Sequence, residues 1–326
     1  KYVLDQMADQ GYISKEEAEA AKQVKLTFKS KADRISAPHF VFYVREQLEK
    51  EFGAAIANEG GLKITTTLDY KMQTAAEDAV AAQAPKNVKR GAKNAAFVAE
   101  NPKNGDILAM VGSVDYFDTE NDGNVNVAIR LRSPGSSFKP IAYTQMLLKG
   151  YTTETVLADV PIDFGTAEKA YRPLDYDKNF RGPVTLRQAL SNSLNIPAVE
   201  ALYLGGLKET LALAQKMGLT SLTDGDRYGL SLVLGGGEVR LLDMVSAYGV
   251  FATEGIQHPS RAILKIESSS GRVIYDANKN QLTENRVLDK EITRQITDVL
   301  SDNNARAPIF GTNSPLQLGA RPVAAK

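Results

Sequence analysis

The clearest β signal in this sequence is a pair of apolar runs, 95–100 and 107–112, that flank a single turn segment. The residues between them are Asn, Pro, Lys, Asn, Gly and Asp, so the pattern predicts an antiparallel hairpin. Two more β-like runs, 262–267 and 273–275, are joined by a turn at 268–271. Hairpins separated by a long helical stretch predict an α/β protein with antiparallel strand pairing.

Helical signals fill the rest of the chain. Helices are predicted at 15–23 after a Ser14/Glu17 capping box and at 70–82 after the N-cap Asp69. Another helix is opened by Pro38 and ended by Gly53, with Val41, Val44, Leu48 and Phe52 on one stripe. Further helices are predicted at 136–148, after a Thr185/Gln188 capping box, at 197–205 and at 239–251. A short strand is predicted at 62–67, and the polar, basic segment 81–93 is predicted to be a solvated connector.

Charge and composition exclude several kinds of function. Lys and Arg number 39, and Asp and Glu number 39, so neither nucleic acid nor an anionic membrane surface is expected as the principal partner. The absence of Cys removes a disulfide framework and a thiol nucleophile. The only two histidines, His39 and His258, are expected to be structural, which argues against a zinc hydrolase.

Two segments resemble ligand-binding loops but lack an essential residue. The segment from Asp118 begins like a calcium loop, yet its twelfth position is Ile129, where a bidentate Glu is required. It is interpreted as a turn rich in acids. The glycines 235–237 lack the Lys and Ser/Thr that end a phosphate loop, so they are interpreted as the entry to a helix. No metal and no cofactor is therefore expected.

A Ser-x-x-Lys pattern occurs once, at Ser136 and Lys139. Ser136 falls in the first turn of a predicted helix, where unpaired N–H groups and the helix dipole favour developing negative charge. Lys139 lies three residues on, on the same face, so its amine can reach the hydroxyl. To act as a base the lysine must be neutral, which requires burial or a second cation. The alternative interpretation is a helix start with an exposed lysine.

The surrounding residues resemble class A penicillin-binding proteins, the bifunctional enzymes of peptidoglycan synthesis. Segment 132–140, Arg-Ser-Pro-Gly-Ser-Ser-Phe-Lys-Pro, resembles their first motif, and Ser193-Leu194-Asn195 resembles the second, Ser-x-Asn. The bare pattern recurs at 301–303 but is rejected, because 301–311 resembles a different family segment. The third motif, Lys-Thr/Ser-Gly, is absent, and Lys326 resembles its lysine.

The resemblance implies a fold and a domain division. The fold would be that of penicillin-binding and serine β-lactamase-like transpeptidases, an antiparallel sheet flanked by helices, with its C-terminal strands missing from this chain. Residues 1–60 would be the tail of a glycosyltransferase domain and a mostly helical linker, and 61–326 an incomplete transpeptidase domain. The chain is thus expected to be a piece of a longer, membrane-anchored protein, whose missing C-terminal segment would be a partner.

The resemblance also implies a reaction on stem peptides that end in D-Ala-D-Ala. Ser136 would attack the penultimate carbonyl and Lys139 would take its proton. Ser193 would relay a proton to the leaving amine, and Asn195 would hold the substrate amide. Lys326 would face the terminal carboxylate and depress the pKa of Lys139 by like charge. β-Lactams would acylate Ser136, and the location would be extracytoplasmic.

Two other functions stay open. One is a serine hydrolase of the same fold, a D,D-carboxypeptidase or a β-lactamase, although no base for rapid deacylation stands out. The other is a non-catalytic binding or interaction module that keeps the fold without turnover.

Overall fold

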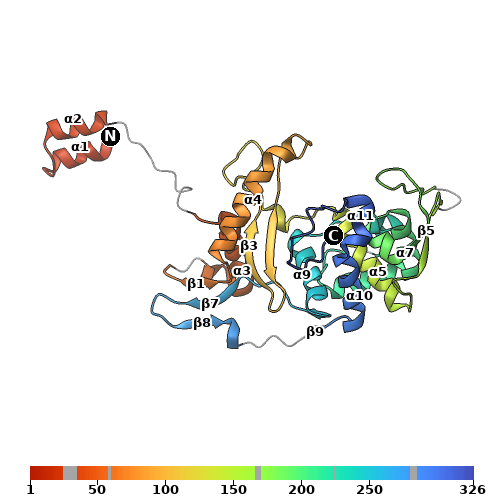
Figure 1. Ribbon diagram of the computed structural model, residues 1–326. Coiled ribbons are helices and arrows are strands. Elements are labelled where there is room, and N and C mark those ends of the chain that lie inside the picture. The colour runs from red at the N-terminus through yellow and green to blue at the C-terminus, as the bar shows by residue number, and fades with distance from the viewer. Residues whose placement is uncertain (25–34, 58–59, 166–169, 224, 280–284) are drawn as a thin grey trace. The chain divides into compact units, whose positions relative to one another are not determined.

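The computed structural model (Figure 1) describes the chain except for residues 25–34, 58–59, 166–169, 224 and 280–284. The chain divides into two compact units, Lys1–Ser36 and Ala37–Lys326. This boundary in the packing precedes the family domain boundary expected at residue 60, which stays a prediction.

The first unit is a pair of short helices, α1 (Tyr2–Asp9) and α2 (Lys15–Gln23). The capping box predicted before α2 is confirmed: Glu17 N donates to Ser14 Oγ at 3.1 Å, and Ser14 N donates to Glu17 Oε2 at 2.7 Å. Lys22 of α2 forms an ion pair with Asp5 of α1, so charge as well as the turn joins the two helices.

The second unit begins with a helix packed on a three-stranded antiparallel sheet. The helix is α3 (Pro38–Ala57), and the strands are β1 (Lys63–Thr66), β7 (Ile263–Glu267) and β8 (Val273–Asp276), in the order β1-β7-β8. The three predicted strands are therefore confirmed. Their core contains Ile266 together with Phe40, Val44 and Leu48 of α3.

The apolar stripe of α3 differs from the predicted one at its start. Val41 is 44% exposed, whereas Phe40 is 2% exposed and takes the buried position one turn before Val44. Gly53 has a φ of 84°, which interrupts the helix where an end was predicted, but helical geometry resumes up to Ala57. A positive φ is easily adopted by glycine, so the interruption is a property of that residue.

Next come α4 (Tyr70–Val88) and the hairpin of β2 (Phe97–Asn101) and β3 (Asp106–Val111). The hairpin and the N-cap Asp69 are confirmed, because Asp69 accepts from Lys71 N and Met72 N. The connector predicted at 81–93 is wrong up to residue 88, since α4 continues through Pro85. The alanine-rich sequence before this proline favours the helix, which ends three residues after it.

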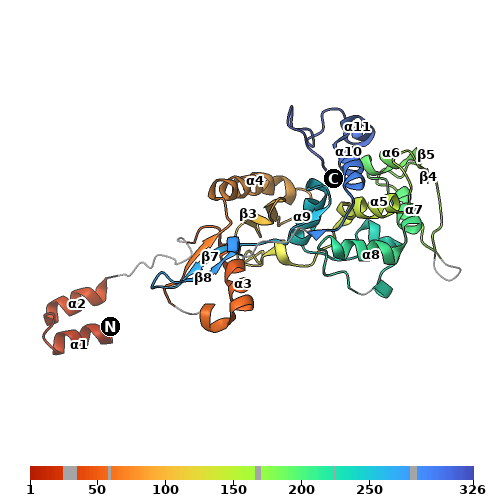
Figure 2. The same cartoon turned by 90° about the horizontal axis from the view of Figure 1, so that it is seen from below.

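A group of helices forms the rest of the second unit (Figures 1 and 2). They are α5 (Lys139–Leu148), α6 (Leu186–Ser191), α7 (Ile196–Gly205), α8 (Leu207–Lys216), α9 (Leu241–Ala252), α10 (Lys290–Ser301) and α11 (Asn303–Phe310), with two small sheets, β4 (Val156–Asp159) with β5 (Gly182–Thr185) and β6 (Ile256–Gln257) with β9 (Asn285–Arg286). Short 3-10 turns lie at η2 (Val127–Ile129), η3 (Gly135–Phe138), η4 (Gly225–Arg227), η5 (Leu230–Leu234) and η6 (Ala277–Lys279).

Helix α5 lies at the centre of this group. Residues 139–147 are all buried, and α6, α7, α8 and α10 pack around them. A helix that is buried on every side is expected to carry apolar residues all round. Helix α5 does so at many of its positions, but some of its buried residues are polar. The most unusual of these is Lys139, whose side chain is 0% exposed.

Four helices, α1, α8, α10 and α11, and the two small sheets were not among the predicted elements. Signals for α10 were present, because Asp289 accepts from Glu291 N as an N-cap and apolar residues recur at Ile292, Ile296 and Val299. Helices α8 and α11 were missed as well. The short sheets pair segments that are distant in sequence, so no local pattern marks them.

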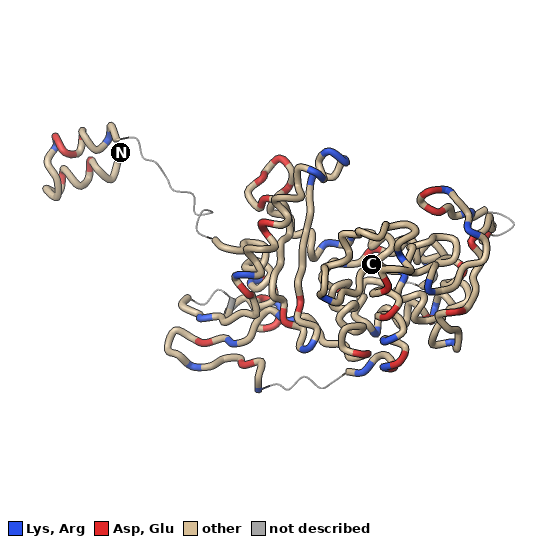
Figure 3. Tube along the Cα trace, viewed as in Figure 1, with Lys and Arg blue, Asp and Glu red and all other residues tan. Residues whose placement is uncertain are grey.

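Charges of both signs are interspersed along the trace (Figure 3). The end of α4 lies beside the acidic turn at 118–122, since Val88 of α4 lines one surface cavity with Asp118 and Glu120, as does Lys93 after the helix. The turn itself is built on Asp118, which accepts from Glu120 N at 2.9 Å and Asn121 N at 3.1 Å. Among the described helices, none is long and apolar enough to cross a membrane.

His39 joins α3 to the end of β3. The Ser113 hydroxyl donates to the carbonyl of Gly123 at 2.7 Å, so its oxygen is left to accept from His39 Nε2 at 2.8 Å. Gly112 makes room for the ring, because a Cβ at this position would lie 2.7 Å from His39 Cγ. His39 is thus a structural residue, as predicted, and Ser113 is not activated by it.

Folding stability is expected to depend on pH through His39. Burial lowers its pKa below the ordinary value of 6.5, and the Gly123 carbonyl opposes this effect. Below pH 6.5 the unfolded chain binds a proton that the folded chain does not, so stability falls as the pH decreases. Chemical unfolding of His39→Gln should show a weaker loss over this range, whereas the control His258→Gln should follow the wild type. Equal losses in all three proteins would contradict this assignment.

Candidate active site

An aromatic side chain anchors the turn that carries Ser136 to the hydrophobic core. The helix predicted over 136–148 begins as the 3-10 turn η3 and becomes α-helical at Lys139. Phe138, between the two, is 0% exposed and belongs to the main core. Ser136, two residues earlier, is half-buried. The anchor therefore fixes the main chain of the turn that carries this serine.

Segments near α9 fix the same turn from its sides. Arg132 and Val239 exchange two backbone hydrogen bonds of 2.9 Å, and Ser133 Oγ donates to the carbonyl of Gly235 at 2.8 Å. Gly235 has a φ of 100°, and a Cβ on it would lie 2.5 Å from Gly135 N. The glycines interpreted as a helix entry therefore also make room for the Ser136 turn, which sequence patterns did not reveal.

Lys139 points into a ring of oxygen acceptors. Its ammonium donates to the carbonyl of Ser193 at 2.6 Å, the carbonyl of Leu194 at 3.1 Å and Oδ1 of Asn195 at 2.7 Å, with Ser193 Oγ at 3.4 Å. Burial lowers the pKa of Lys139 to about 8, and the charge of Asp175 opposes this effect. Burial, which a lysine needs in order to act as a base near neutral pH, is therefore present at Lys139.

The structure brings Lys139, Ser193 and Asn195 together, and Ser136 precedes Lys139 by three residues in the chain. No hydrogen bond of the described residues joins the Lys139 ammonium to the Ser136 hydroxyl. A protonated amine prefers carbonyl oxygens, and the hydrogen bonds of a catalytic base often tighten only when substrate binds.

Ser193 and Asn195 lie on a strained turn that leads into α7. Ser193 has a φ of 59°, a region that residues with a side chain seldom adopt and that is enriched at functional sites. Both ends of the Asn195 amide are engaged, because Oδ1 accepts from Lys139 and Nδ2 donates to the carbonyl of Leu174 at 2.8 Å. The expected role of Asn195 in holding a substrate amide thus requires exchange of the second bond.

Lys326 lies on the other side of the Ser193 turn. Its ammonium donates to the carbonyl of Leu190 at 3.2 Å, the same carbonyl that accepts from Ser193 N at 3.2 Å. Burial lowers the pKa of Lys326 to about 7, followed by the charges of Lys139 and Arg306. Burial is the first cause of the lowered pKa of Lys139, and the like charge of the two lysines lowers the pKa of Lys326. The expected effect of Lys326 on Lys139 stays a prediction.

The second Ser-x-Asn pattern, at 301–303, lies where α10 ends and α11 begins. Ser301 ends α10 and its hydroxyl donates to the carbonyl of Asp298, while Asp302 caps α11 by accepting from Ala305 N at 2.8 Å. Within the described part of the chain, no group of three or more His, Asp and Glu residues could hold a metal ion.

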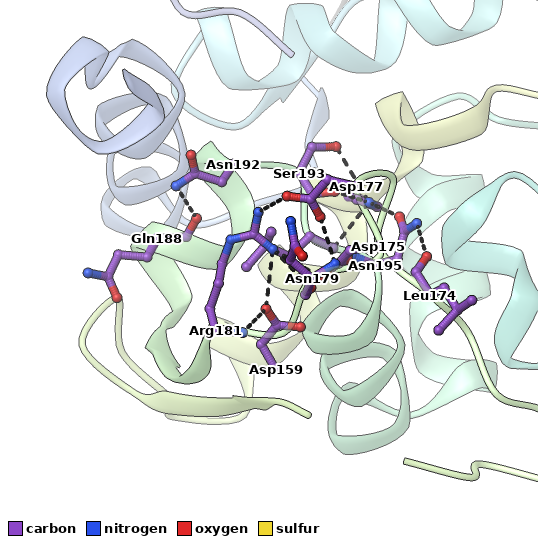
Figure 4. A network of polar contacts seen from close by, with 12 residues as sticks. Asp159, Leu174, Asp175, Asp177, Asn179, Arg181, Gln188, Asn192, Ser193 and Asn195 are labelled. Carbon is purple, nitrogen blue, oxygen red and sulfur yellow. Dashed lines mark hydrogen bonds and ion pairs between the residues drawn. The ribbon is translucent and has the colours of Figure 1, made fainter. Parts of the chain in front are cut away.

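A charged network that the sequence patterns did not indicate adjoins the site (Figure 4). Asp175 accepts from Asn195 N, and Arg181 pairs with Asp159, Asp175 and Asp177. Asp159 and Arg181 are neighbours because β4 ends at Asp159, which pairs with Gly182, the first residue of β5. Asp175, Asp177 and Arg181 lie in the segment between β4 and β5. This segment meets Ser193–Asn195 only in the folded protein, so no local sequence pattern indicates the contact.

Comparisons with known proteins agree with this geometry. Residues 95–326 match the model of the penicillin-binding protein transpeptidase domain. Penicillin-binding protein 2D of Bacillus subtilis (strain 168) is 29% identical over 300 residues, 89% of this chain and 42% of that protein. Penicillin-binding protein 1C of Escherichia coli (strain K12) is 33% identical over 255 residues, 78% of this chain and 31% of that protein.

A solved structure is similar over most of the chain as well. The penicillin-binding protein PonA1 from Mycobacterium tuberculosis has a TM-score of 0.73 and 25% sequence identity, covering 87% of this chain and 73% of that one. The chain thus spans less than half the length of the two curated relatives. Because the domain model matches more than half of its residues, the chain belongs to the penicillin-binding protein transpeptidase family.

Proposed function

We propose that the protein is a D,D-transpeptidase that cross-links peptidoglycan stem peptides through an acyl-enzyme on Ser136. The observation that carries this proposal is the burial of Lys139 against the Ser193–Asn195 turn, one helical turn from Ser136. A lysine with a pKa of about 8 is neutral in roughly a tenth of the molecules at pH 7, far more than an exposed lysine.

In the first step, Ser136 Oγ forms a bond to the penultimate D-Ala carbonyl carbon and its proton passes to Lys139 Nζ. In this proposal the Ser136 N–H, in the first turn before α5, donates to the oxyanion. The bond to the terminal D-Ala nitrogen then breaks, and the leaving amine receives a proton through Ser193. Lys326 binds the terminal carboxylate of the substrate.

In the second step, an amine of a neighbouring stem peptide attacks the ester carbon. A new amide forms, the ester bond breaks and Ser136 recovers its proton. β-Lactams present a similar carbonyl to Ser136 but remain attached. The reaction takes place outside the cytoplasmic membrane, because peptidoglycan lies there, and anchoring and glycan polymerisation belong to the proposed longer protein.

Mass spectrometry with benzylpenicillin tests the proposal. We expect the intact protein to gain one penicillin mass, and fragmentation of the adduct peptide to locate it on Ser136. Ser137 is an internal control, because its hydroxyl is engaged with the Pro134 carbonyl at 2.8 Å. A folded protein without an adduct, or an adduct on another residue, would overturn the proposal.

A further inference from the structure

The carboxylate of Asp175 has partners on two sides. Its Oδ1 accepts from Asn195 N, and its Oδ2 lies 3.5 Å from Arg181 Nη1 (Figure 4). The residue before it, Leu174, accepts from Asn195 Nδ2 at 2.8 Å. The loop before β5 therefore holds both the main chain and the side chain of Asn195.

This arrangement buries charged side chains, and removing a charge from water costs free energy. Asp175 is 4% exposed and Asp159 is 0% exposed, and Arg181 is the cation that pairs with both. Burial raises the pKa of Asp159 to about 6, and its contact with Asp175 contributes in the same direction. Among the described residues, its Oδ1 has no hydrogen-bond partner. Apolar residues of the same size are often as stabilising as a buried ion pair, so core stability alone does not account for the network.

The position of Asp175 relative to α7 indicates what the network does. Asn195 is the N-cap of α7 and has no side-chain capping bond of its own. An N–H at a helix start lacks an intrahelical acceptor and favours a negative charge. Asp175 supplies that acceptor from a distant loop, while Oδ1 of the same Asn195 accepts from Lys139 at 2.7 Å.

We propose that Asp175 is a positioning residue of the active site, which holds the Ser193–Asn195 turn against Lys139 and is itself held by Arg181. This inference rests on the proposed function, because it concerns the base of that reaction. Asp175 touches Asn195 and Arg181 and acts on the reacting atoms through them.

The charge of Asp175 has a second effect, on the protonation of Lys139. Burial lowers the pKa of Lys139, and Asp175 is the charge that opposes this effect. The other charged or titratable groups around it are Lys326 of the C-terminal segment with Arg306 behind it, Asp159 and Arg181 behind Asp175, buried Tyr143 of α5, Glu200 of α7, which accepts from Ala158 N, and Tyr248 of α9, which donates to the Ser137 carbonyl. Asp175→Asn leaves all these side chains in place. Of them, Asp159 and Arg181 lose a charged neighbour, so the variant reports on Asp175 together with this pair.

The test is the pH profile of acylation by benzylpenicillin. In the wild type the rate should rise with pH through a midpoint near 8, as Lys139 loses its proton. Asp175→Asn keeps an acceptor for Asn195 N but removes the charge, so the midpoint should move to lower pH by about 1 unit. Asp175→Ala also removes the acceptor, and its maximal rate should fall about 10-fold.

Two further variants separate positioning from a general loss of structure. Arg181→Gln leaves the charge of Asp175 less neutralised, so the midpoint should move to higher pH, opposite to Asp175→Asn. Asp177→Asn is the matched control, because Asp177 pairs with the same arginine at 2.6 Å but is more exposed, and it should leave the profile unchanged. A structural role alone would lower the melting temperature without opposite shifts.

The outcomes distinguish this inference from the proposed function. Absence of Ser136 acylation in the wild type would overturn both. Acylation of the wild type with an unshifted midpoint in Asp175→Asn and Arg181→Gln would overturn the role of Asp175 alone. If Asp175→Asn does not fold, the upward shift in Arg181→Gln supports the inference, and its absence overturns it.

Discussion

The Lys139→Met variant is expected to react with benzylpenicillin about 100- to 10,000-fold more slowly than the wild type, the range by which a positioned base accelerates proton transfer. Methionine keeps the length and the apolar stem of the side chain and removes the amine. The variant removes the proposed base of Ser136 and leaves the carbonyls of Ser193 and Leu194 without this donor. Stopped-flow acylation measures the rate.

Lys149→Met is the matched control for this variant. Lys149 directly follows the same helix, α5, but is exposed and donates to the Leu204 carbonyl at 3.3 Å. Its acylation rate should stay within about twofold of the wild type. Since Lys139→Met leaves buried carbonyls without a donor, circular dichroism must show that it is folded. A folded Lys139→Met protein that reacts at the wild-type rate would refute the assignment of Lys139 as the base.

The second large effect is expected on stability, in Leu202→Ala. Leu202 is 0% exposed in α7 and belongs to the core around α5. Truncation of a buried leucine removes its transfer free energy and leaves a cavity, which lowers the free energy of unfolding by about 2–5 kcal/mol. Urea unfolding followed by far-UV circular dichroism measures this change.

Tyr203→Ala is the control on the adjacent position of the same helix. Tyr203 is 67% exposed, so its truncation should change the free energy of unfolding by only about 0.5 kcal/mol. Similar losses in both variants would contradict the assigned orientation of α7. Because α7 begins at the Asn195 turn, a destabilised but folded Leu202→Ala protein should also bind benzylpenicillin more slowly.

Local patterns predicted much of the fold. The capping boxes at Ser14 and Thr185 and the N-cap at Asp69 formed as expected, because each depends on residues within three positions of one another. The same patterns failed at the end of α4, where polar residues after Ala82 indicated a connector although the helix continues. Polarity reports exposure, and an exposed segment can still be helical when its residues favour a helix.

The sequence by itself determined which residues are proposed to carry the chemistry, because the spacing of Ser136 and Lys139 predicts them on one turn and the Ser193–Asn195 motif is read directly from the chain. Only the tertiary structure decided what surrounds them: the burial of Lys139, the left-handed backbone of Ser193 and the loop that brings Asp175 to Asn195. The physical reason is range. Caps and turns are fixed by neighbours in the chain, whereas burial and charge depend on segments that only folding brings together.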